Sequence, residues 1–448
     1  MSTVSTARAQ RVLDGPIFAT LARLAAPGAL LALFQTAVSI ADTHFVGQLG
    51  TEALAGLALV FPMVMLLQML SAGAMGGGVS SALARALGGG RGDGARGIVA
   101  HGLAIAAAAG LAFTALLLGL GDSLYALLGG RGEALAQALE YSHVLFAGAI
   151  GVWLANTLAS VLRGSGNTLA PAVALALAAL LHIPLSGALT LGWGPFPRLG
   201  IAGAGLAYVA DFLFASLLMG MMVWRAGLQP QRAHWRLEAR VLREILRVGA
   251  VSSVGALQTV LTAVVLTGFV GSFGTAALAG YGVGVRLELL QIPLVFAIGQ
   301  ALVVMVGTNI GAGRGARAKR IAWTGTALAA GISLAIGATV ALLPGVWIRI
   351  FSDDSAVLAT GSLYLRIVAP FYVLFGAGMA LYFASQGAGR MVLPVLAGTV
   401  RLVVVVAGGA LVVALGGPLG AVFAVIAGGI ALFGALIIAA VRAGRWES

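Results

Sequence analysis

Long apolar runs alternate with short polar connections along the whole chain. Twelve of these runs are long enough to cross a lipid bilayer as helices, which takes about 20 residues each. Six lie in the first half of the sequence, near residues 21–47, 54–80, 97–120, 138–162, 168–191 and 200–224. Six lie in the second half, near residues 246–270, 277–305, 321–343, 361–386, 392–415 and 419–441. The pattern predicts an all-α polytopic membrane protein with twelve transmembrane helices.

The second half of the chain repeats the first half. The segment FVGQLGTEALAG (Phe45 to Gly56) returns as FVGSFGTAALAG (Phe269 to Gly280), with nine of twelve positions identical and an offset of 224 residues. Two further pairs, GGGRGDGAR with GAGRGARAK and GSGNTLAP with GAGRMVLP, are each offset by 223 residues. Similarity at half the chain length indicates a duplicated unit of six helices.

Six is an even number, so both units enter the membrane with the same orientation. Parallel repeats of this kind are related by an axis along the membrane normal. We therefore predict two six-helix lobes related by a pseudo-two-fold axis, formed by residues 1–224 and 248–448. Residues 225–247, which mix arginines with apolar side chains, are expected to form a cytoplasmic linker on the membrane surface.

The basic residues orient this bundle. Twenty of the 26 Lys and Arg residues fall in the termini and in the connections on one side of the predicted topology. The opposite side carries only Arg131, Arg198 and Arg349. Because basic connections stay on the cytoplasmic side, we predict a multi-pass protein of the bacterial inner (plasma) membrane with both termini in the cytoplasm. The net charge of +12 is then a topology signal, and no nucleic-acid partner is expected.

Composition limits the function classes. The chain is 60% hydrophobic and 9% charged, with no cysteine, which is too apolar for a soluble domain. It contains no P-loop, no metal-ligand cluster and no cysteine nucleophile. We therefore expect a protein that is not an enzyme and that uses no cofactor.

Acidic residues within the predicted spans are few. A charge at the centre of a membrane helix costs roughly 2.5–3.5 kcal/mol, so each one requires an explanation. Asp42 lies towards the outer end of the first span, and its counterpart in the second repeat is Leu266. Asp211 is the deepest acid of the sixth span. The candidate coupling residues for protons or cations are Asp42, Asp211 and Glu288. The alternatives are a carboxylate that faces water at Asp42 and a neutral acid bonded to a neighbouring helix at Asp211.

Other polar residues within the spans are candidates for a substrate cavity. Arg286 and Glu288 are two positions apart on one helix and cannot pair with each other there, so each must contact another helix or a cavity. His182 is able to shuttle protons, or it is a hydrogen-bonded residue of the core. Amides such as Asn156 also bond membrane helices together. The full candidate set is Arg286, His182, Gln68, Asn156, Gln258 and Tyr208.

Three motifs carry a family resemblance over the whole chain: ADTHFVGQLGTEALAG (41–56), LRGSGNT (162–168) and VGTNIGAGR (306–314). They resemble the multidrug and toxic compound extrusion (MATE) family, and its DinF-like bacterial branch in particular. The resemblance implies that an aspartate on the first helix takes part in proton coupling, and Asp42 matches that position. Many members carry Asn on the fifth helix and Asp or Asn four residues later, where this chain has His182 and Ser186.

Sodium-coupled members similar to the NorM branch carry acids on the seventh and tenth helices. The matching positions here are Gln258 or Thr259 and Phe375, which disfavours sodium. We therefore expect a secondary-active multidrug antiporter that exports amphipathic, cationic organic compounds in exchange for protons by alternating access. Its expected partners are small-molecule substrates and the lipid bilayer, and we expect a monomer.

Two other functions remain open. A flippase for a lipid or lipid-linked saccharide commonly has more than twelve helices and several basic cavity residues, whereas only Arg286, Arg366 and Arg401 are candidates here. A channel or an intramembrane enzyme is the third possibility. The asymmetry between Asp42 and Leu266 argues against a symmetric pore.

Overall fold

The computed structural model describes residues 3–444 and 446, and all regular elements in this part of the chain are helices. An N-terminal helix, α1 (Thr3–Asp14), precedes the first lobe. The first lobe contains α2 (Ile17–Gly47), α3 (Thr51–Gln68), the π-helical segment η1 (Met69–Met75), α4 (Gly76–Gly88), α5 (Gly92–Leu127), α6 (Gly132–Ala147), α7 (Ala149–Gly164), α8 (Leu169–Leu191) and α9 (Ile201–Arg225). A short 3-10 helix, η2 (Arg232–Trp235), lies between the lobes in sequence.

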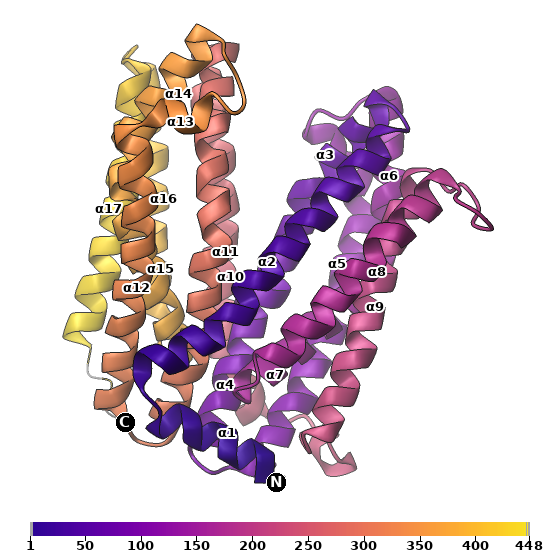
Figure 1. Ribbon diagram of the computed structural model, residues 1–448, viewed down its shortest axis with the longest axis vertical. Coiled ribbons are helices and arrows are strands. Elements are labelled where there is room, and N and C mark those ends of the chain that lie inside the picture. Colours follow the sequence, from indigo (N-terminus) through magenta and orange to yellow (C-terminus); the bar gives the residue numbers. More distant parts are fainter. Residues whose placement is uncertain (1–2, 445, 447–448) are drawn as a thin grey trace.

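The second lobe repeats this plan (Figure 1). It contains α10 (Ala239–Gly271), α11 (Thr275–Gly311), α12 (Gly315–Leu342), α13 (Pro344–Ile348), α14 (Ser355–Val368), η3 (Ala369–Phe371), α15 (Tyr372–Gly387), α16 (Val392–Ala414) and α17 (Leu419–Ala443). Because α10 begins at Ala239, the last nine residues of 225–247 are helical.

The prediction of twelve transmembrane helices in two lobes is confirmed. Eleven described spans are long and apolar enough to cross a membrane, and α6 with α7, which meet at an angle of 50°, form a twelfth if the bent pair is one span. Large apolar side chains such as Leu33, Leu217 and Leu342 are exposed on these helices. Such a surface suits contact with lipid.

Glycine allows the helices of a lobe to approach closely. A Cβ atom on Gly110 of α5 would lie 2.7 Å from the Cα of Ile150 on α7, a distance at which a side chain does not fit. Small residues at helix contacts are typical of membrane proteins, where close van der Waals packing replaces the hydrophobic effect between helices.

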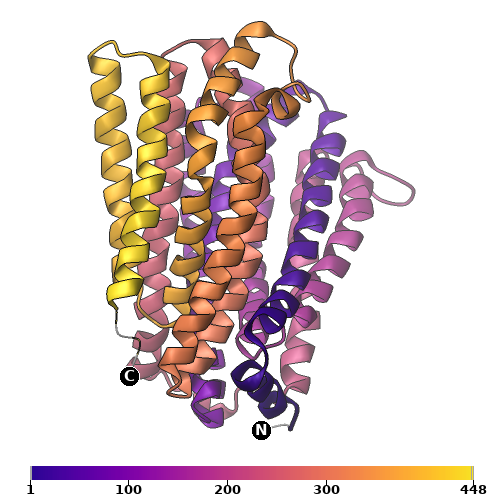
Figure 2. The same cartoon turned by 60° about the vertical axis from the view of Figure 1, so that its left-hand side comes forward.

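The first helix of each lobe is partly buried in the other lobe. Leu21 and Leu24, at the start of α2, pack in the second-lobe core with residues such as Leu302, whereas Val46 at its end belongs to the first-lobe core. Ile245 of α10 is likewise buried in the first-lobe core. In Figure 1, α2 (indigo) runs diagonally from the second lobe to the first, and in Figure 2 its later part runs beside α8.

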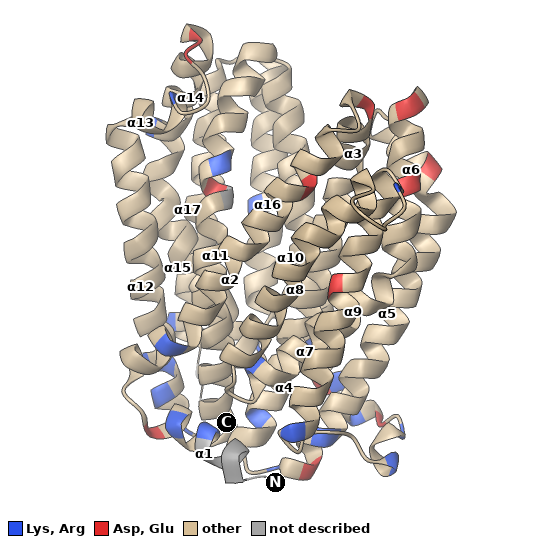
Figure 3. Cartoon of the chain, turned by 45° about the vertical axis from the view of Figure 1, so that its right-hand side comes forward, with Lys and Arg blue, Asp and Glu red and all other residues tan. Residues whose placement is uncertain are grey.

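The two lobes touch at the end of the molecule where both termini lie, which we call the basic end because Lys and Arg gather there (Figure 3). Towards the far end the helices of the two lobes diverge (Figure 1). At the basic end α4 packs against α11 so tightly that a Cβ on Gly88 would overlap the carbonyl oxygen of Thr308.

Arg85 of α4 forms hydrogen bonds at the same interface between the lobes. It donates to Ser81 and, at 3.1 Å, to the carbonyl oxygen of Gly387 on α15. Ser81 Oγ in turn donates to the carbonyl oxygen of Gln386 at 2.6 Å. Glu244 of α10 lies 3.7 Å from the Arg85 guanidinium. The basic end is therefore closed by backbone packing and by hydrogen bonds between lobes.

Candidate functional site

Three titratable residues from three helices meet inside the first lobe. Nε2 of His182 on α8 lies 2.9 Å from Oδ1 and 3.1 Å from Oδ2 of Asp42 on α2. Nδ1 of the same ring lies 3.2 Å from Oδ2 of Asp211 on α9, an ion-pair distance without hydrogen-bond alignment. The histidine is fully buried, and Asp42 and Asp211 are 9% and 8% exposed. We call these three residues the aspartate–histidine cluster.

The spacing of residues on α8 explains how Asp42 is held. His182 and Ser186 are four residues apart, so they lie on the same face of the helix. Ser186 Oγ donates to Asp42 Oδ1 at 2.6 Å, while the imidazole approaches both oxygens of the same carboxylate. Helix α8 lies between α2 and α9, and this arrangement places the imidazole between the two carboxylates.

This arrangement can hold and exchange protons. A neutral imidazole carries one N–H, and a protonated imidazole donates from both nitrogens, so the ring has a carboxylate to meet in either state. With His182 protonated and both aspartates ionised, the cluster carries a net charge of −1. Oδ1 of Asp211 is buried and accepts no hydrogen bond from the described residues. This oxygen is a further position at which a proton can bind.

A chain of hydrogen bonds begins beside the cluster. The ring of Tyr208 packs edge-on against His182, with 6.5 Å between centroids. Gln68 Nε2 donates to the Tyr208 hydroxyl at 2.7 Å, Asn156 Nδ2 donates to Gln68 Oε1 at 2.9 Å, and Asn156 also donates to Ser71 Oγ at 2.8 Å. The predicted residues Gln68, Asn156 and Tyr208 are thus joined to one another.

The chain of hydrogen bonds ends in the π-helical segment η1, which interrupts the second span. Such segments occur frequently at functional sites. Two residues after Ser71, the carbonyl oxygen of Gly73 accepts a hydrogen bond from Gln386 of the second lobe at 3.1 Å. Segment η1 therefore takes part both in the hydrogen-bond chain of the first lobe and in the interface between the two lobes.

Glu288 lies in a separate polar group in the second lobe. Its Oε1 accepts hydrogen bonds from the hydroxyl of Tyr364 and, at 3.3 Å, from that of Tyr372. Arg401 of α16 and Glu288 do not form an ion pair within 4.0 Å in the described part of the chain.

The remaining candidates lie apart from the aspartate–histidine cluster. Arg286 stacks over the ring of Phe351 at 5.2 Å and does not pair with Glu288. Gln258 donates to Thr399 Oγ1 at 2.7 Å, and its Oε1 is buried without a partner among the described residues. In the same part of the chain, no group of three His, Cys, Asp or Glu residues is arranged to hold a metal ion.

The duplication also appears in the comparison with protein families. The family model MatE matches residues 27–187 and again residues 252–411, one match in each lobe. This chain belongs to the MatE family. It is therefore a MATE transporter, as the resemblance of its motifs implies.

Similar proteins cover most of this MATE chain. It is 28% identical over 360 residues to a FAD transporter of Shewanella oneidensis, covering 80% of this chain and 79% of that protein. It is 26% identical over 379 residues to a probable multidrug resistance protein NorM of Thermotoga maritima, covering 84% and 81%. The solved structure of a MOP superfamily transporter from Pyrococcus furiosus superposes with a TM-score of 0.88 at 26% identity, covering 97% and 98%.

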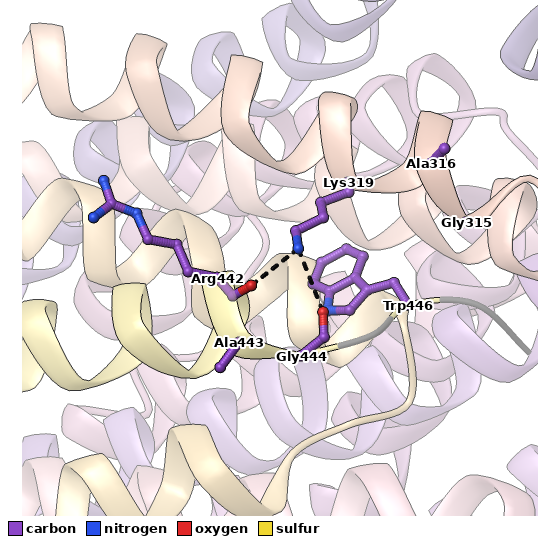
Figure 4. Close-up of a pocket in the computed structure, with 7 residues that line it drawn as sticks. All are labelled: Gly315, Ala316, Lys319, Arg442, Ala443, Gly444 and Trp446. Atoms are coloured by element: carbon purple, nitrogen blue, oxygen red, sulfur yellow. Dashed lines mark hydrogen bonds between the residues drawn. The ribbon is translucent and has the colours of Figure 1, made fainter.

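A surface pocket at the basic end of this MATE protein contains none of the predicted site residues. Lys319 of α12 donates to the carbonyl oxygens of Arg442 and Gly444 at 3.1 and 3.4 Å (Figure 4). Trp446 packs beside them and is 5% exposed. A lysine at the last carbonyls of a helix stabilises that end, so this group fixes the end of α17 to α12.

Several residues of the two polar groups were not predicted as site residues of this MATE protein. Ser71, Tyr364 and Tyr372 are uncharged and lie in apolar runs, where nothing in the local pattern separates them from residues of the core. Ser186 had a detectable signal, because it follows His182 by four residues on a predicted helix.

Proposed function

We propose that this MATE protein is a proton-coupled antiporter that exports amphipathic, cationic organic compounds by alternating access. The observation that carries the proposal is the position of His182 between Asp42 and Asp211. Three titratable groups in contact within a membrane-spanning lobe form a site whose charge changes when protons bind. Ionisable residues inside a membrane protein typically mark such pathways.

Protonation of the cluster would control the affinity for a cation. A deprotonated carboxylate attracts a cation strongly in a surrounding of low dielectric constant. Each proton that binds removes one negative charge and weakens that attraction. Because coupling between two ligands is reciprocal, a substrate that is displaced by protons must also displace them. Exchange of protons for substrate follows from this competition.

The same contacts disfavour sodium as the coupling ion. Both oxygens of Asp42 are approached by N–H or O–H groups of His182 and Ser186. A sodium ion needs several oxygen ligands and would have to displace these donors. Protons require no such rearrangement, because the existing groups accept them directly.

The charge pattern supports an orientation with the basic end in the cytoplasm of a bacterial inner membrane. Both termini are then cytoplasmic, and the lobes are in contact on the cytoplasmic side. Export requires a second arrangement in which the contact between α4 and α11 opens and the far end closes. We expect a single chain to be sufficient for this exchange, because each chain contains both lobes.

The test is efflux from proteoliposomes that contain the purified protein and a proton gradient. We expect efflux of a cationic dye such as ethidium to stop when a protonophore is added and to stay unchanged when sodium is replaced by choline. Efflux that is lost on removal of sodium would refute proton coupling. Failure to move any of several cationic dyes would refute the choice of substrate class.

A further inference from the structure

The second transmembrane span connects the hydrogen-bond chain of the first lobe with the contact between the lobes. Its first part, α3, carries Gln68 of that chain, and its last part, α4, carries Gly88 at the contact with α11. Between them lies η1, where the N–H of Gly76 donates to the carbonyl oxygen of Ser71 five residues earlier, the spacing of a π-helix. A change of the helical register within η1 therefore shifts α4 relative to α3, by about 1.5 Å for each residue.

Three glycines follow η1, and each lies against a different helix. A Cβ atom on Gly76 would lie 2.5 Å from Ser160 Oγ on α7, and one on Gly78 would lie 2.9 Å from the backbone of α10. A Cβ on Gly77 would overlap the side-chain amide of Gln386 on α15. Both lobes therefore enclose residues 69–78, which we call the π-glycine segment. Kinks in helices typically occur at π-helical segments and at small residues such as these.

Gln386 holds the second span on both sides of these glycines. Its Nε2 donates to the carbonyl oxygen of Gly73 at 3.1 Å and to Ser252 Oγ of α10 at 3.2 Å. Its own carbonyl oxygen accepts from Ser81 Oγ of α4 at 2.6 Å. The side chain is fully buried, so it reaches these partners without competition from solvent. Gln386 is thus the polar side chain of the second lobe that fixes the π-glycine segment.

The second repeat shows that the fold alone does not require η1. The equivalent span, α11, is a continuous α-helix over Thr275–Gly311. Arg163, the equivalent of Gln386 at an offset of 223 residues, donates at 2.9 Å to Ser160 Oγ on its own helix. Among the described residues, the π-helical segment therefore occurs only in the lobe that contains the aspartate–histidine cluster.

The aspartate–histidine cluster acts on η1 through the hydrogen-bond chain. The chain begins at Tyr208, whose ring packs against His182. It reaches Ser71 through Gln68 and Asn156. Hydrogen bonds in a chain polarise one another where the dielectric constant is low. A change in the charge of the cluster therefore changes the strength of the hydrogen bond that Ser71 accepts inside η1.

We propose that Gln386 is the positioning residue that links protonation of the aspartate–histidine cluster to the contact between the lobes. Its bond to Gly73 holds the π-helical register in which the basic end is closed. A change in the charge of the cluster weakens that register, the bond breaks, and α4 moves relative to α11. The inference rests on the proposed proton-coupled antiport and adds to it the residue that transmits the change to the contact between α4 and α11.

Gln386→Met tests this role, because it removes both N–H donors and keeps the length of the side chain. Two properties of the purified variant are measured: ethidium binding as a function of pH, and proton-driven ethidium efflux from proteoliposomes. We expect the pH at which half of the ethidium is bound to stay the same, because the cluster is unchanged. Efflux should fall by about tenfold, a typical strength of coupling between two sites. A residue that only stabilised the fold would reduce binding and efflux together.

Gly77→Ala is a second test that leaves Gln386 itself in place. Its methyl group overlaps the amide and pushes it away from Gly73. We expect the same pattern, with normal pH dependence of binding and reduced efflux. This variant also replaces the first one if Gln386→Met does not fold.

Two matched controls accompany these variants. Tyr382→Phe removes a hydrogen bond from α15 to the carbonyl oxygen of Ser252, which lies within the second lobe. Gly220→Ala adds a methyl group where no atom lies within 4 Å. Both should leave ethidium binding and efflux unchanged.

The inference is wrong if Gln386→Met or Gly77→Ala folds and retains the efflux of the unmodified protein, or if either shifts the pH dependence of ethidium binding. It is also wrong if Tyr382→Phe lowers efflux as strongly as they do. Failure of the proposed function is a separate result, which would appear as absence of proton-driven ethidium efflux by the unmodified protein.

Discussion

Gly88 of α4 and Thr308 of α11 bring the backbones of the two lobes into contact at the basic end. A Cβ atom on Gly88 would overlap the carbonyl oxygen of Thr308, and a Cβ on Gly311 would overlap that of Arg85 in the same way. Even a methyl group at either position forces the helices apart. The arrangement in which the basic end is closed therefore depends on these two glycines.

Gly88→Ala should shift the protein towards the arrangement with the basic end open. Overpacking typically costs about 1–3 kcal/mol, which is enough to change the ratio of two conformations by about fivefold or more. The chain has no cysteine, so spin labels can be placed at Gly94→Cys and Ala316→Cys, two exposed positions, one in each lobe. The fraction of molecules with a longer distance between the two labels should increase.

The matched control is Gly331→Ala on α12, where a Cβ would meet no atom within 4 Å. It should leave the distance distribution unchanged. Identical distributions for Gly88→Ala and the unmodified protein would contradict a role for this contact in closure.

Asp42→Asn should abolish coupling without loss of the fold. Asparagine keeps the shape of the side chain and can still accept from Ser186, but it carries no exchangeable charge. We expect proton-driven dye efflux to fall by about tenfold or more, because a group that does not titrate cannot link proton release to substrate binding. Efflux and protein yield are measured together. Normal efflux at normal yield would exclude Asp42 and favour Asp211 or Glu288.

His182→Asn tests the bridge between the two aspartates. An amide can donate to one carboxylate and accept from another group, but it cannot become positively charged. The two carboxylates would then have no group between them that can become positively charged. We expect efflux to fall by about tenfold and its dependence on external pH to change, since one titrating group is lost. A variant with the efflux rate and pH profile of the unmodified protein would show that His182 is structural.

A monovalent cationic dye should depend on the first lobe. Asp211→Asn and Asp42→Asn should each weaken binding of ethidium, whereas Glu288→Gln should matter less, because Glu288 already receives two tyrosine hydroxyls. Equilibrium binding to purified variants measures this. Loss of binding in Glu288→Gln alone, with both aspartate variants normal, would place the cationic substrate in the second lobe.

The architecture was accessible from sequence because hydropathy and duplication are strong, local signals. The length of each apolar run sets the span, and the repeat sets the number of lobes. The bend between α6 and α7 and the π-helical segment η1 lie inside apolar runs and leave no mark in hydropathy. The sequence also does not reveal which polar residues pair. Asp42 and His182 are 140 residues apart, and no sequence pattern fixes how their helices are aligned along the membrane normal.

Partners of individual charges were hidden for the same reason. The two-residue spacing of Arg286 and Glu288 correctly separates them, yet it cannot point to Tyr364 or Tyr372, which belong to other helices. Likewise, apolar residues such as Leu21 and Leu24 would suit the core of either lobe. The sequence therefore does not predict that the start of α2 is buried in the second lobe.

That burial has a consequence for each half of the chain. Leu21 of α2 packs in the core of the second lobe, and Ile245 of α10 packs in the core of the first. The first helix of each half therefore begins in the core of the other half. This is domain swapping within a single polypeptide. A six-helix unit on its own would leave a groove unfilled in its core and would leave the start of its first helix exposed. Both are covered when two such units pack together. Neither half of the chain can therefore bury all of its apolar surface without the other half.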